Sequence, residues 1–454
     1  MYAILAIDSK NGISSRGKIP WSIPEDISNF EALTQTAPPG KQNALIMGAQ
    51  TWNSTPFYDK TLNIVLTTGK TKLVEKLNAP YVASSLDNGL EIAKTLNVFR
   101  IFIIGGVRLF HEAKVKGYFI TRLNDDFQCD KFLYQKLYPD DDKISYSFKS
   151  GKSLEVSFCY RGSLKIYEKP ESSYLDLLNK VIQIGEVRQT RNGMVRSLFS
   201  AELEFSLEFF PLLTTKKMFF KGIIEELLFF LRGETDTTKL SKEKVHIWEK
   251  NTSRKTLDKL GFSDYPQGEM GPMYGYQWRS FNKPFPNSDS TGIDTFSELL
   301  DNLCSDPTSR RLILTTLNMS QVRQGVLWPC HGLVVQFYVS NDRKLSCKMY
   351  QRSADIFLGM PFNISSYSAL VYVICKVLTN RGHPMTPGKL YLSFGDVHIY
   401  EEHISAATQQ LIRPPFDFPK LTLENLSTNV EDFTFKDFKL ENYVCYPKIP
   451  AKIL

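Results

Sequence analysis

Apolar and polar positions change their period along the chain. The first third contains short continuous apolar runs, YAILAI, NALIMG, LNIVLTT and VFRIFIIGG, and the last of these leads into a helical window, VRLFHEAKV, at residues 107–115. Apolar strands that alternate with helices are typical of an α/β fold with a mostly parallel central sheet, because helices cover both faces of such a sheet. The pattern therefore predicts an α/β domain in the first third.

From Tyr174 onward the apolar positions have helical spacing. YLDLLNKVIQIGEV predicts one helix, and KGIIEELLFFLRG predicts a strongly apolar helix that ends at Gly233. Between the two patterns lies YEKPESS, which is polar, contains a proline and follows neither period. The expected organisation is a domain at residues 1–166, a short linker at residues 167–173 and a second domain at residues 174–454.

Composition and charge limit the classes of function. The chain of 454 residues is 42% hydrophobic and 23% charged, which suits a folded protein of about two domains. A net charge of +7 is compatible with nucleic-acid binding, and equally with an enzyme that attracts small anions. The sequence has no run of five Lys or Arg and no zinc-finger spacing, so we favour small anions and expect no nucleic-acid partner.

The seven cysteines are scattered and include no CxxC pair, which argues against a disulfide framework and against a thiolate metal site. The N-terminus lacks the pattern of a leader, and no apolar stretch approaches 18 residues. We therefore expect a cytoplasmic protein without a metal or a membrane partner.

WPCHG, at residues 328–332, is the segment that most strongly indicates chemistry. Most cysteines serve as small buried apolar residues, and this is our expectation for Cys347 and Cys375. Cys330 differs because its motif is followed downstream by Arg352, whose positive charge can stabilise a thiolate. Cys330 is therefore a candidate nucleophile.

Several arginines occur where a phosphate site would need them, because guanidinium groups bind phosphate oxygens in bidentate geometry. Whether they converge in space is open at this point, and scattered surface arginines are the alternative. The candidates are Arg191, Arg310, Arg311 and Arg352.

Residues 174–454 resemble thymidylate synthase through an ordered series of segments that includes FPLLTTKK, GPMYGYQWR, WPCHG, YQRSADIFLGMPFNISSY and GDVHIYEEH. The resemblance implies an α+β domain that methylates dUMP reductively to dTMP with 5,10-methylenetetrahydrofolate. It implies that Cys330 attacks C6 of the pyrimidine. It further implies a homodimer in which Arg310 and Arg311 reach the phosphate of the partner's site.

The same resemblance implies roles for other residues of this domain. Glu226 would order water and relay protons, although Glu225 and Glu226 could instead simply mark the polar edge of their helix. Asn363 would read the uracil edge, and the terminal segment YPKIPAKIL would close over the bound ligands. The remaining implied residues are Arg191, Arg352, Ser353, Asp355, His398 and Tyr400 for dUMP, Lys216, Trp248, Asn251 and Asp355 for the folate, and Tyr274 for catalysis.

Near the N-terminus, GKIPWSIPEDISNF places one carboxylate, Asp26, among the apolar residues Ile23, Ile27 and Phe30, which are expected to face a core. A buried carboxyl tends to have a raised pKa, as a proton donor requires. The alternative is that Asp26 and its neighbour Glu25 are an acidic pair at a helix N-terminus, stabilised by the helix dipole.

Together with LIMGAQTW, YFITRL and the glycine pair in IFIIGGVRLF, this segment resembles dihydrofolate reductase over residues 1–165. The resemblance implies reduction of dihydrofolate by NADPH, with Asp26 supporting protonation of the pterin. The implied folate residues are Trp21, Asp26, Phe30, Ile104 and Thr121, and the implied NADPH residues are Gly48, Thr51, Ser54, Thr67, Thr68, Gly105 and Gly106.

Two positions depart from the reductase pattern. Ala49 stands where a cation near the cofactor phosphates is usual, and Thr61 stands where an arginine pairs with the folate carboxylate. The two resemblances together imply a bifunctional enzyme that makes dTMP and recycles the folate product. The alternative is an active synthase that carries a reductase-like scaffold domain without activity.

Overall fold

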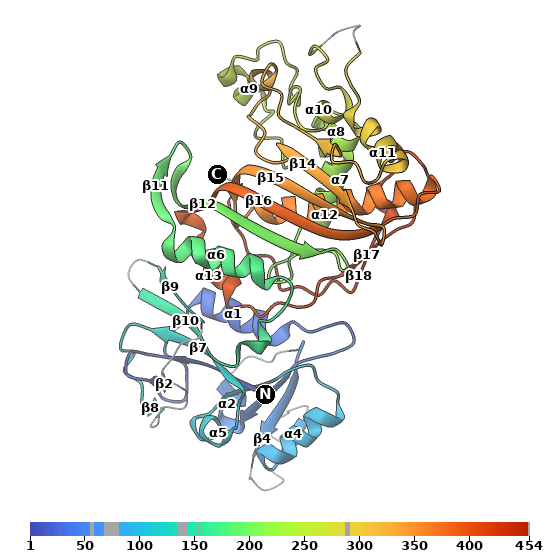
Figure 1. Cartoon of the computed structure of the whole chain (residues 1–454). Coiled ribbons are helices and arrows are strands. Elements are labelled where there is room, and N and C mark those ends of the chain that lie inside the picture. The colour runs from blue at the N-terminus through green and yellow to red at the C-terminus, as the bar shows by residue number, and fades with distance from the viewer. Residues whose placement is uncertain (55–58, 68–80, 134–143, 152–153, 287–290, 453–454) are drawn as a thin grey trace.

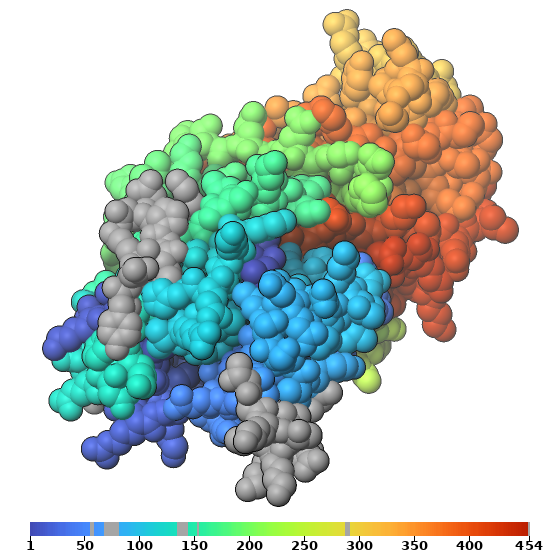
Figure 2. Space-filling view, turned by 90° about the horizontal axis from the view of Figure 1, so that it is seen from below, coloured from blue at the N-terminus to red at the C-terminus, as the bar shows by residue number. Residues whose placement is uncertain are grey.

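The computed structural model of the protein describes residues 1–54, 59–67, 81–133, 144–151, 154–286 and 291–452. These residues form two α/β bodies, one from the first third of the chain and one from the remainder, that lie against each other (Figure 1). In Figure 2 the blue atoms of the first third lie directly beside green and red atoms of the later chain.

The N-terminal domain is built on an eight-stranded sheet with the order β5-β4-β3-β6-β1-β7-β10-β9. The strands from β5 to β7 pair in parallel, and β10 pairs antiparallel with both β7 and β9. The predicted mostly parallel sheet is therefore confirmed. The strands are β1 (Tyr2–Ile7), β3 (Ala44–Gly48), β4 (Leu62–Leu66), β5 (Tyr81–Ala83), β6 (Ile101–Gly105), β7 (Gly117–Leu123), β9 (Ile144–Ser150) and β10 (Leu154–Gly162), beside a separate pair, β2 (Gly12–Ser14) and β8 (Lys131–Phe132).

Short helices connect these strands. The helix expected at residues 107–115 ends at Glu112, because the backbone is extended from Ala113 and leads into β7 at Gly117. The helices of this domain are α1 (Pro24–Gln35), α2 (Ala49–Ser54), α4 (Leu86–Thr95) and α5 (Val107–Glu112), with a 3-10 turn η1 (Leu164–Ile166).

The second domain contains a six-stranded sheet with the order β11-β12-β16-β15-β14-β13, in which only β15 and β16 pair in parallel. This mixture of a largely antiparallel sheet with packed helices agrees with the expected α+β class. The strands are β11 (Glu186–Thr190), β12 (Gly193–Ser206), β13 (Ile313–Leu314), β14 (Val334–Val339), β15 (Lys344–Asp355) and β16 (Thr386–Tyr400), with a separate pair, β17 (Lys420–Leu423) and β18 (Phe438–Glu441).

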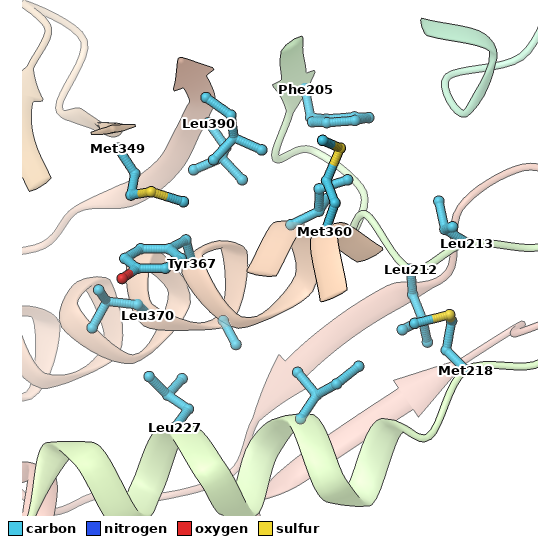
Figure 3. Close-up of a cluster of buried hydrophobic side chains, with 14 of the residues drawn as sticks. Phe205, Leu212, Leu213, Met218, Leu227, Met349, Met360, Tyr367, Leu370 and Leu390 are labelled. Carbon is cyan, nitrogen blue, oxygen red and sulfur yellow. The ribbon is translucent and has the colours of Figure 1, made fainter. Parts of the chain in front are cut away.

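Helix α12 (Gly359–Asn380) packs against one face of this sheet, and α7 (Phe220–Leu231) packs on α12. Figure 3 shows Leu227 of α7 facing Leu370 of α12, with Met349 and Leu390 of the sheet on the other side of α12. Among the described helices, α12 alone is long and apolar enough to cross a membrane, and 78% of its most apolar window is buried in this core. The other helices are α6 (Ser172–Ile184), α8 (Thr238–Lys242), α9 (Arg254–Leu260), α10 (Gly275–Arg279), α11 (Thr295–Ser305) and α13 (Ile404–Leu411), with 3-10 turns η2 (Val322–Gln324), η3 (Glu401–His403), η4 (Val430–Asp432) and η5 (Phe435–Asp437).

The polar segment between the domains is tightly packed. Tyr167 is buried and donates a hydrogen bond to the carbonyl of Ile412 at 3.1 Å. Glu171 has no exposed surface, and its carboxylate accepts hydrogen bonds from the backbone N–H and the hydroxyl of both Thr214 and Thr215. The expected linker is therefore a fixed junction and not a free tether.

Candidate active sites

Arg352, on β15, holds the segment that carries Cys330. Its backbone N–H donates to the carbonyl of Cys330 at 2.9 Å, and its guanidinium donates to the carbonyls of Pro329 at 2.9 Å and Trp328 at 2.8 Å. Three consecutive carbonyls are thus fixed by one residue, and the thiol is held beside a permanent positive charge.

A close contact on the other side of this segment requires glycine. Gly332 has φ +69°, and a Cβ at this position would lie 2.2 Å from the hydroxyl oxygen of Tyr367. The last residue of WPCHG therefore has a steric reason to be glycine.

Tyr274 contacts Cys330 through one hydroxyl group. Its oxygen lies 3.5 Å from the Cys330 sulfur and accepts a hydrogen bond from the Cys330 backbone N–H at 3.3 Å. Stacking on the rings of Phe230 and His331, with centroids 5.0 Å and 4.5 Å away, fixes the tyrosine ring. Burial raises the pKa of the Cys330 thiol, while the Tyr274 hydrogen bond and the Arg352 charge oppose that rise.

His331 is adjacent to the thiol in sequence but is not a cation. It is buried, and burial lowers its pKa to about 3. Its Nδ1 lies 3.0 Å from the hydroxyl of Tyr367, where it can accept a hydrogen bond. The positive charge available to a thiolate at Cys330 therefore comes from Arg352.

Glu226, on α7, is only 8% exposed and accepts a hydrogen bond from the indole N–H of Trp248 at 2.8 Å. Burial raises its pKa to about 7, and the Trp248 hydrogen bond opposes the rise. A carboxyl that exchanges its proton near neutral pH suits proton transfer. The alternative, that Glu225 and Glu226 mark the polar edge of the helix, requires exposed side chains, but both glutamates are buried.

Asn363, on α12, is buried and oriented by a neighbour that the sequence analysis did not single out. The side-chain amide of Gln351 donates to Asn363 Oδ1 at 3.1 Å. This contact leaves the NH2 group of Asn363 as the donor for a ligand. Gln351 lies inside the YQRS motif, and its position next to Arg352 was the only feature of the sequence that could have marked it as functional.

Lys216 and Asp355 meet at the turn that precedes α12. The Lys216 ammonium donates to the carbonyl of Phe357 and lies 3.7 Å from the centroid of the Phe357 ring, and Asp355 Oδ1 accepts from the Phe357 N–H at 2.9 Å. Burial lowers the pKa of Lys216 to about 7, against the opposing charges of Asp355 and Glu171.

Strand pairing brings further candidates to this edge of the site. In the parallel register of β15 and β16, Ser353 pairs with Asp396 and Asp355 pairs with His398. His398 Nδ1 lies 2.8 Å from Asp396 Oδ1, and its ring centroid lies 5.6 Å from that of Tyr400. Ser353, Asp355, His398 and Tyr400 are therefore grouped. Asn251 belongs to the neighbouring segment, where its N–H donates to the carbonyl of Trp248 at 3.0 Å.

The exposed arginines are not brought together within one chain. Arg191 lies in the turn between β11 and β12 at one edge of the sheet, and Arg310 and Arg311 precede β13 at the other edge. In Figure 1 the β11–β12 hairpin and α11, which precedes this arginine pair, lie on opposite sides of the domain. Five strand spacings separate the two edges, roughly 24 Å.

In the N-terminal domain, Asp26 lies on α1 and accepts a hydrogen bond from the hydroxyl of Thr121 on β7 at 2.6 Å. Burial of the carboxyl raises the pKa of Asp26, and the Thr121 hydrogen bond opposes the rise. Glu25 has a different environment, since it accepts a hydrogen bond from Ser150 at 2.9 Å. The two acidic residues are therefore not an equivalent pair at the helix end.

The apolar neighbours of Asp26 are only partly as expected. Ile23 is buried and Phe30 is half-buried, but Ile27 is 48% exposed, so the expectation that it faces a core is wrong. The reason is that Ile23 lies before the helix in extended conformation, whereas α1 buries the face that carries Asn29 and Leu33, and Ile27 lies on the opposite face. Trp21 is buried with its ring edge-on to Phe127 at 5.3 Å.

A cleft of about 680 Å³ opens where β3 and β6 end. Gly105 has φ +141°, and a Cβ there would lie 3.0 Å from Thr51 Oγ1, so the glycine keeps the cleft open beside α2. The cleft is lined by Gly48, Thr51, Ser54, Thr67, Gly105 and Gly106 of the predicted cofactor residues, and by Ile104. Thr68 lies outside the described residues.

The same cleft contains cations that the sequence analysis missed. These cations are Lys18, Arg108 and Lys131, and they line the cleft together with Ala49. Arg108 lies in the first turn of α5, directly after the glycine pair, and this placement was the available signal. Thr61 is buried beside β4, where its carbonyl accepts a hydrogen bond from the side chain of Asn63 at 3.1 Å.

Comparison with known proteins covers both domains. The thymidylate synthase family model matches residues 172–454, and the dihydrofolate reductase family model matches residues 1–156. The bifunctional dihydrofolate reductase-thymidylate synthase of Zea mays is 33% identical over 100% of this chain and 96% of its own length. The chain belongs to the bifunctional dihydrofolate reductase-thymidylate synthase family.

Proteins of the same name from distant organisms are equally similar. The relative from Paramecium tetraurelia is 33% identical over 99% of this chain and 98% of its own length, and that from Leishmania major is 34% identical over 99% and 94%. As a member of the family, the chain has thymidylate synthase and dihydrofolate reductase activities.

The raised pKa of Glu226 predicts a pH-dependent cost to stability. Between its ordinary pKa and about 7, the folded state binds a proton that the unfolded state has lost, so stability falls as the pH rises through that window. Glu226→Gln removes this cost. The difference in free energy of unfolding between the variant and the unmodified protein should therefore shift by about 2 kcal/mol in favour of the variant as the pH rises from 5 to 8.

The measurement is urea unfolding at both pH values, in which a spectroscopic signal reports the unfolding of the synthase domain. Glu208→Gln, on an exposed carboxylate, is the matched control and should show no such gain. A gain for Glu226→Gln that is equal at both pH values would contradict the prediction.

Proposed function

We propose that a thiolate at Cys330 adds to C6 of dUMP and begins the conversion of dUMP to dTMP. The observation that carries this proposal is the set of hydrogen bonds from Arg352 to the carbonyls of residues 328–330, which holds the sulfur beside a guanidinium. Addition at C6 moves the electron pair of the C5–C6 double bond towards C5 and the carbonyl at C4. Carbon C5 thereby becomes nucleophilic towards the methylene carbon of 5,10-methylenetetrahydrofolate.

The surrounding residues serve this addition. The NH2 group of Asn363, oriented by Gln351, donates to a pyrimidine carbonyl and stabilises the negative charge that develops there. Glu226, with a pKa of about 7, exchanges protons with the base through water. Tyr274 holds the thiol in place through its hydroxyl. The C5 proton is then lost and the bond from the methylene carbon to the folate nitrogen breaks. The folate transfers a hydride to that carbon and the Cys330–C6 bond breaks, which yields dTMP, dihydrofolate and the free thiolate.

We assign the remaining candidates to the two ligands of this site. Asp355 and Lys216, which share the turn at Phe357, bind the folate with Trp248 and Asn251. The dUMP phosphate and ribose are bound by Arg191, Arg352, Ser353, Asp355, His398 and Tyr400, together with Arg310 and Arg311 of a second chain.

We propose a homodimer through the synthase domain. Arg191 and the Arg310–Arg311 pair lie at opposite edges of one sheet, so a second copy is needed to bring both to one phosphate. The sheet face opposite α12 also exposes large apolar side chains, among them Phe199 at 83% and Tyr338 at 67%. Exposed apolar area of this kind indicates an interface between chains.

For the N-terminal domain we propose that Asp26 and Thr121 bind the pterin of dihydrofolate and support its protonation, with Trp21, Phe30 and Ile104 around it. The glycines at residues 48, 105 and 106, with Thr51, Ser54 and Thr67, line a cleft of suitable size for NADPH. NADPH supplies a hydride when bound. Lys18 and Lys131 provide the positive charge that Ala49 does not, while Arg108 lies in the cleft as an ion pair with Glu112.

We also propose residues 167–173 as the junction of the domains and the cytoplasm as the location. The burial of Tyr167 and Glu171 supports the first, and the seven free thiols support the second. The rival function, a synthase with an inactive reductase-like scaffold, rests on Ala49 and Thr61. The cations found in the cofactor cleft weaken that argument.

Cys330→Ser should lower dTMP formation by roughly 1000-fold or more, because a hydroxyl is a far weaker nucleophile than a thiolate. Incubation of the unmodified protein with 5-fluoro-dUMP and methylenetetrahydrofolate should give a covalent adduct on the peptide that contains Cys330, measured by mass spectrometry. Cys347→Ser, at a buried core thiol, is the control and should keep the adduct. A missing adduct in the unmodified protein would overturn the proposed mechanism.

Asp26→Asn should lower the turnover of dihydrofolate by about 100-fold, the usual contribution of one positioned acid or base. The loss of NADPH absorbance measures the rate of this turnover. Glu25→Gln is the matched control and should keep normal turnover, since Glu25 bonds to Ser150 and not to Thr121. No turnover in the unmodified protein would favour the scaffold alternative.

Mixed dimers test the shared phosphate site. A chain with Cys330→Ser and a chain with Arg310→Ala and Arg311→Ala are each inactive alone under the proposal. In a heterodimer one site combines the intact Cys330 of one chain with the intact arginines of the other, so about half of the normal activity per dimer should return. Heterodimers verified by mass spectrometry that remain inactive would exclude the arrangement across the interface.

A further inference from the structure

The C-terminal segment of the synthase domain contributes to the core of the reductase domain. Tyr446 has no exposed surface, and Phe416 is 5% exposed. Both belong to one apolar cluster with reductase residues such as Leu33, Phe102 and Tyr160. The segment that leads to the end of the synthase domain is therefore fixed to its neighbour several residues before it ends.

Arg100 of the reductase domain holds this tyrosine directly. Its Nη1 donates to the Tyr446 hydroxyl at 3.2 Å, and its guanidinium lies 4.7 Å from the ring centroid of Phe99 and 5.4 Å from that of Phe416. Two aromatic rings thus restrict the guanidinium.

The backbone of Arg100 is fixed as well. Its N–H donates to the side chain of Asn43 at 3.2 Å, and its carbonyl accepts from the N–H of Ala44 at 2.8 Å. Asn43 is itself buried and donates to the carbonyl of Thr34 at 2.7 Å. Arg100 is therefore fixed directly before β6, and its side chain holds Tyr446 from a fixed position.

Beyond Tyr446 the chain runs towards the synthase site through further anchors. Arg413 donates to the carbonyl of Pro447 at 2.9 Å, Ile449 is buried, and the ring of His403 bonds to the carbonyl of Lys452 at 2.8 Å. Only five residues lie between the contact at Tyr446 and the contact at Lys452. A segment this short transmits a change at one end to the other.

His403 connects the end of this segment to the proposed ligand site. Its ring centroid lies 5.7 Å from that of Phe357 and 5.7 Å from that of Tyr400. The carbonyl of Phe357 holds Lys216, assigned above to the folate, and Tyr400 is assigned to dUMP. The last described residues of the chain therefore border both ligands.

We propose that Arg100 of the reductase domain is a positioning residue for the synthase reaction. Through Tyr446 it sets the position of residues 446–452, so that the terminal segment closes correctly beside the folate. This inference rests on the ligand assignments of the proposed function. It gives the reductase domain a role in dTMP synthesis that does not involve its own active site.

The test uses the full-length protein and two variants of the contact. Tyr446→Phe removes one oxygen and keeps the buried ring, and Arg100→Met removes the charge and keeps the stem. Each should raise the KM for methylenetetrahydrofolate by about tenfold, the effect expected from one hydrogen bond to a charged group. The turnover of dihydrofolate should stay within about twofold, since none of the residues assigned to that reaction belongs to residues 446–452.

A second measurement is independent of activity. Hydrogen exchange of the peptide that contains residues 446–452 should become faster in both variants. The double variant should be no worse than the more affected single variant, because both changes remove the same contact. Lys94→Met, on an exposed lysine of the reductase domain, is the matched control and should change nothing.

The outcomes separate this proposal from the proposed function. An unmodified protein that makes no dTMP would refute the proposed function, while faster exchange in the variants would still support the positioning contact. An active unmodified protein whose folate KM and exchange are unchanged in both variants would overturn the proposal. Equal loss of both activities in Tyr446→Phe would also overturn it, since that result would assign the contact to general stability.

Discussion

The buried carboxylate of Glu171 connects the elements on which both active sites depend. A carboxylate with no exposed surface costs several kcal/mol unless donors surround it, and here Thr214 and Thr215 provide four. The two threonines in turn hold the rest of the junction. The Thr214 carbonyl accepts from the Tyr446 N–H at 2.8 Å, and the Thr215 carbonyl accepts from Arg413 at 3.0 Å. The next residue is Lys216, which is proposed to bind the folate. The Glu171 carboxylate therefore also fixes the backbone next to that proposed site.

Burial controls the charges of the synthase site. His331 is kept neutral, Glu226 and Lys216 have pKa values of about 7, and Arg352 remains the permanent cation beside the sulfur. Groups that titrate near neutrality can exchange protons, and a guanidinium cannot. In the proposed mechanism, proton transfer at Glu226 is therefore separate from electrostatic stabilisation at Arg352. The same division holds in the reductase domain, where the titratable Asp26 lies apart from the cations of the cofactor cleft.

The sequence predicted the elements well, because they depend on local pattern. The apolar runs matched β1, β3, β4 and β6, and the helix ending at Gly233 matched α7. Six of the seven cofactor candidates line one cleft, since they lie at or after the ends of three adjacent strands, β4, β3 and β6. Apolar character alone could not place Ile27, because α1 buries the opposite face, where the polar residue Asn29 is among the buried side chains.

What the sequence could not predict are contacts between distant segments. Arg100 and Tyr446 are 346 residues apart, and Arg100 lies in no recognisable motif. The support of Asn363 by Gln351 was hidden for a related reason, since a glutamine in a strand is normally an ordinary polar residue. The packing of residues 167–173 also depends on partners that lie far along the chain, so their polar composition alone indicated only a short linker.

The order of strands in the synthase sheet affects how the chain can fold during synthesis. Strand β16 is the last of the six to leave the ribosome, yet it lies between β12 and β15 and pairs with both. Until residue 400 has emerged, the sheet is divided into two parts, and the apolar surface of α12 has no complete layer to cover it. The apolar cluster of the reductase domain that includes Tyr446 is completed later still, once residue 446 has emerged. Completion of both cores thus requires residues 400 and 446 to have been translated, and a nascent chain that lacks them would expose the apolar surface on which chaperones act.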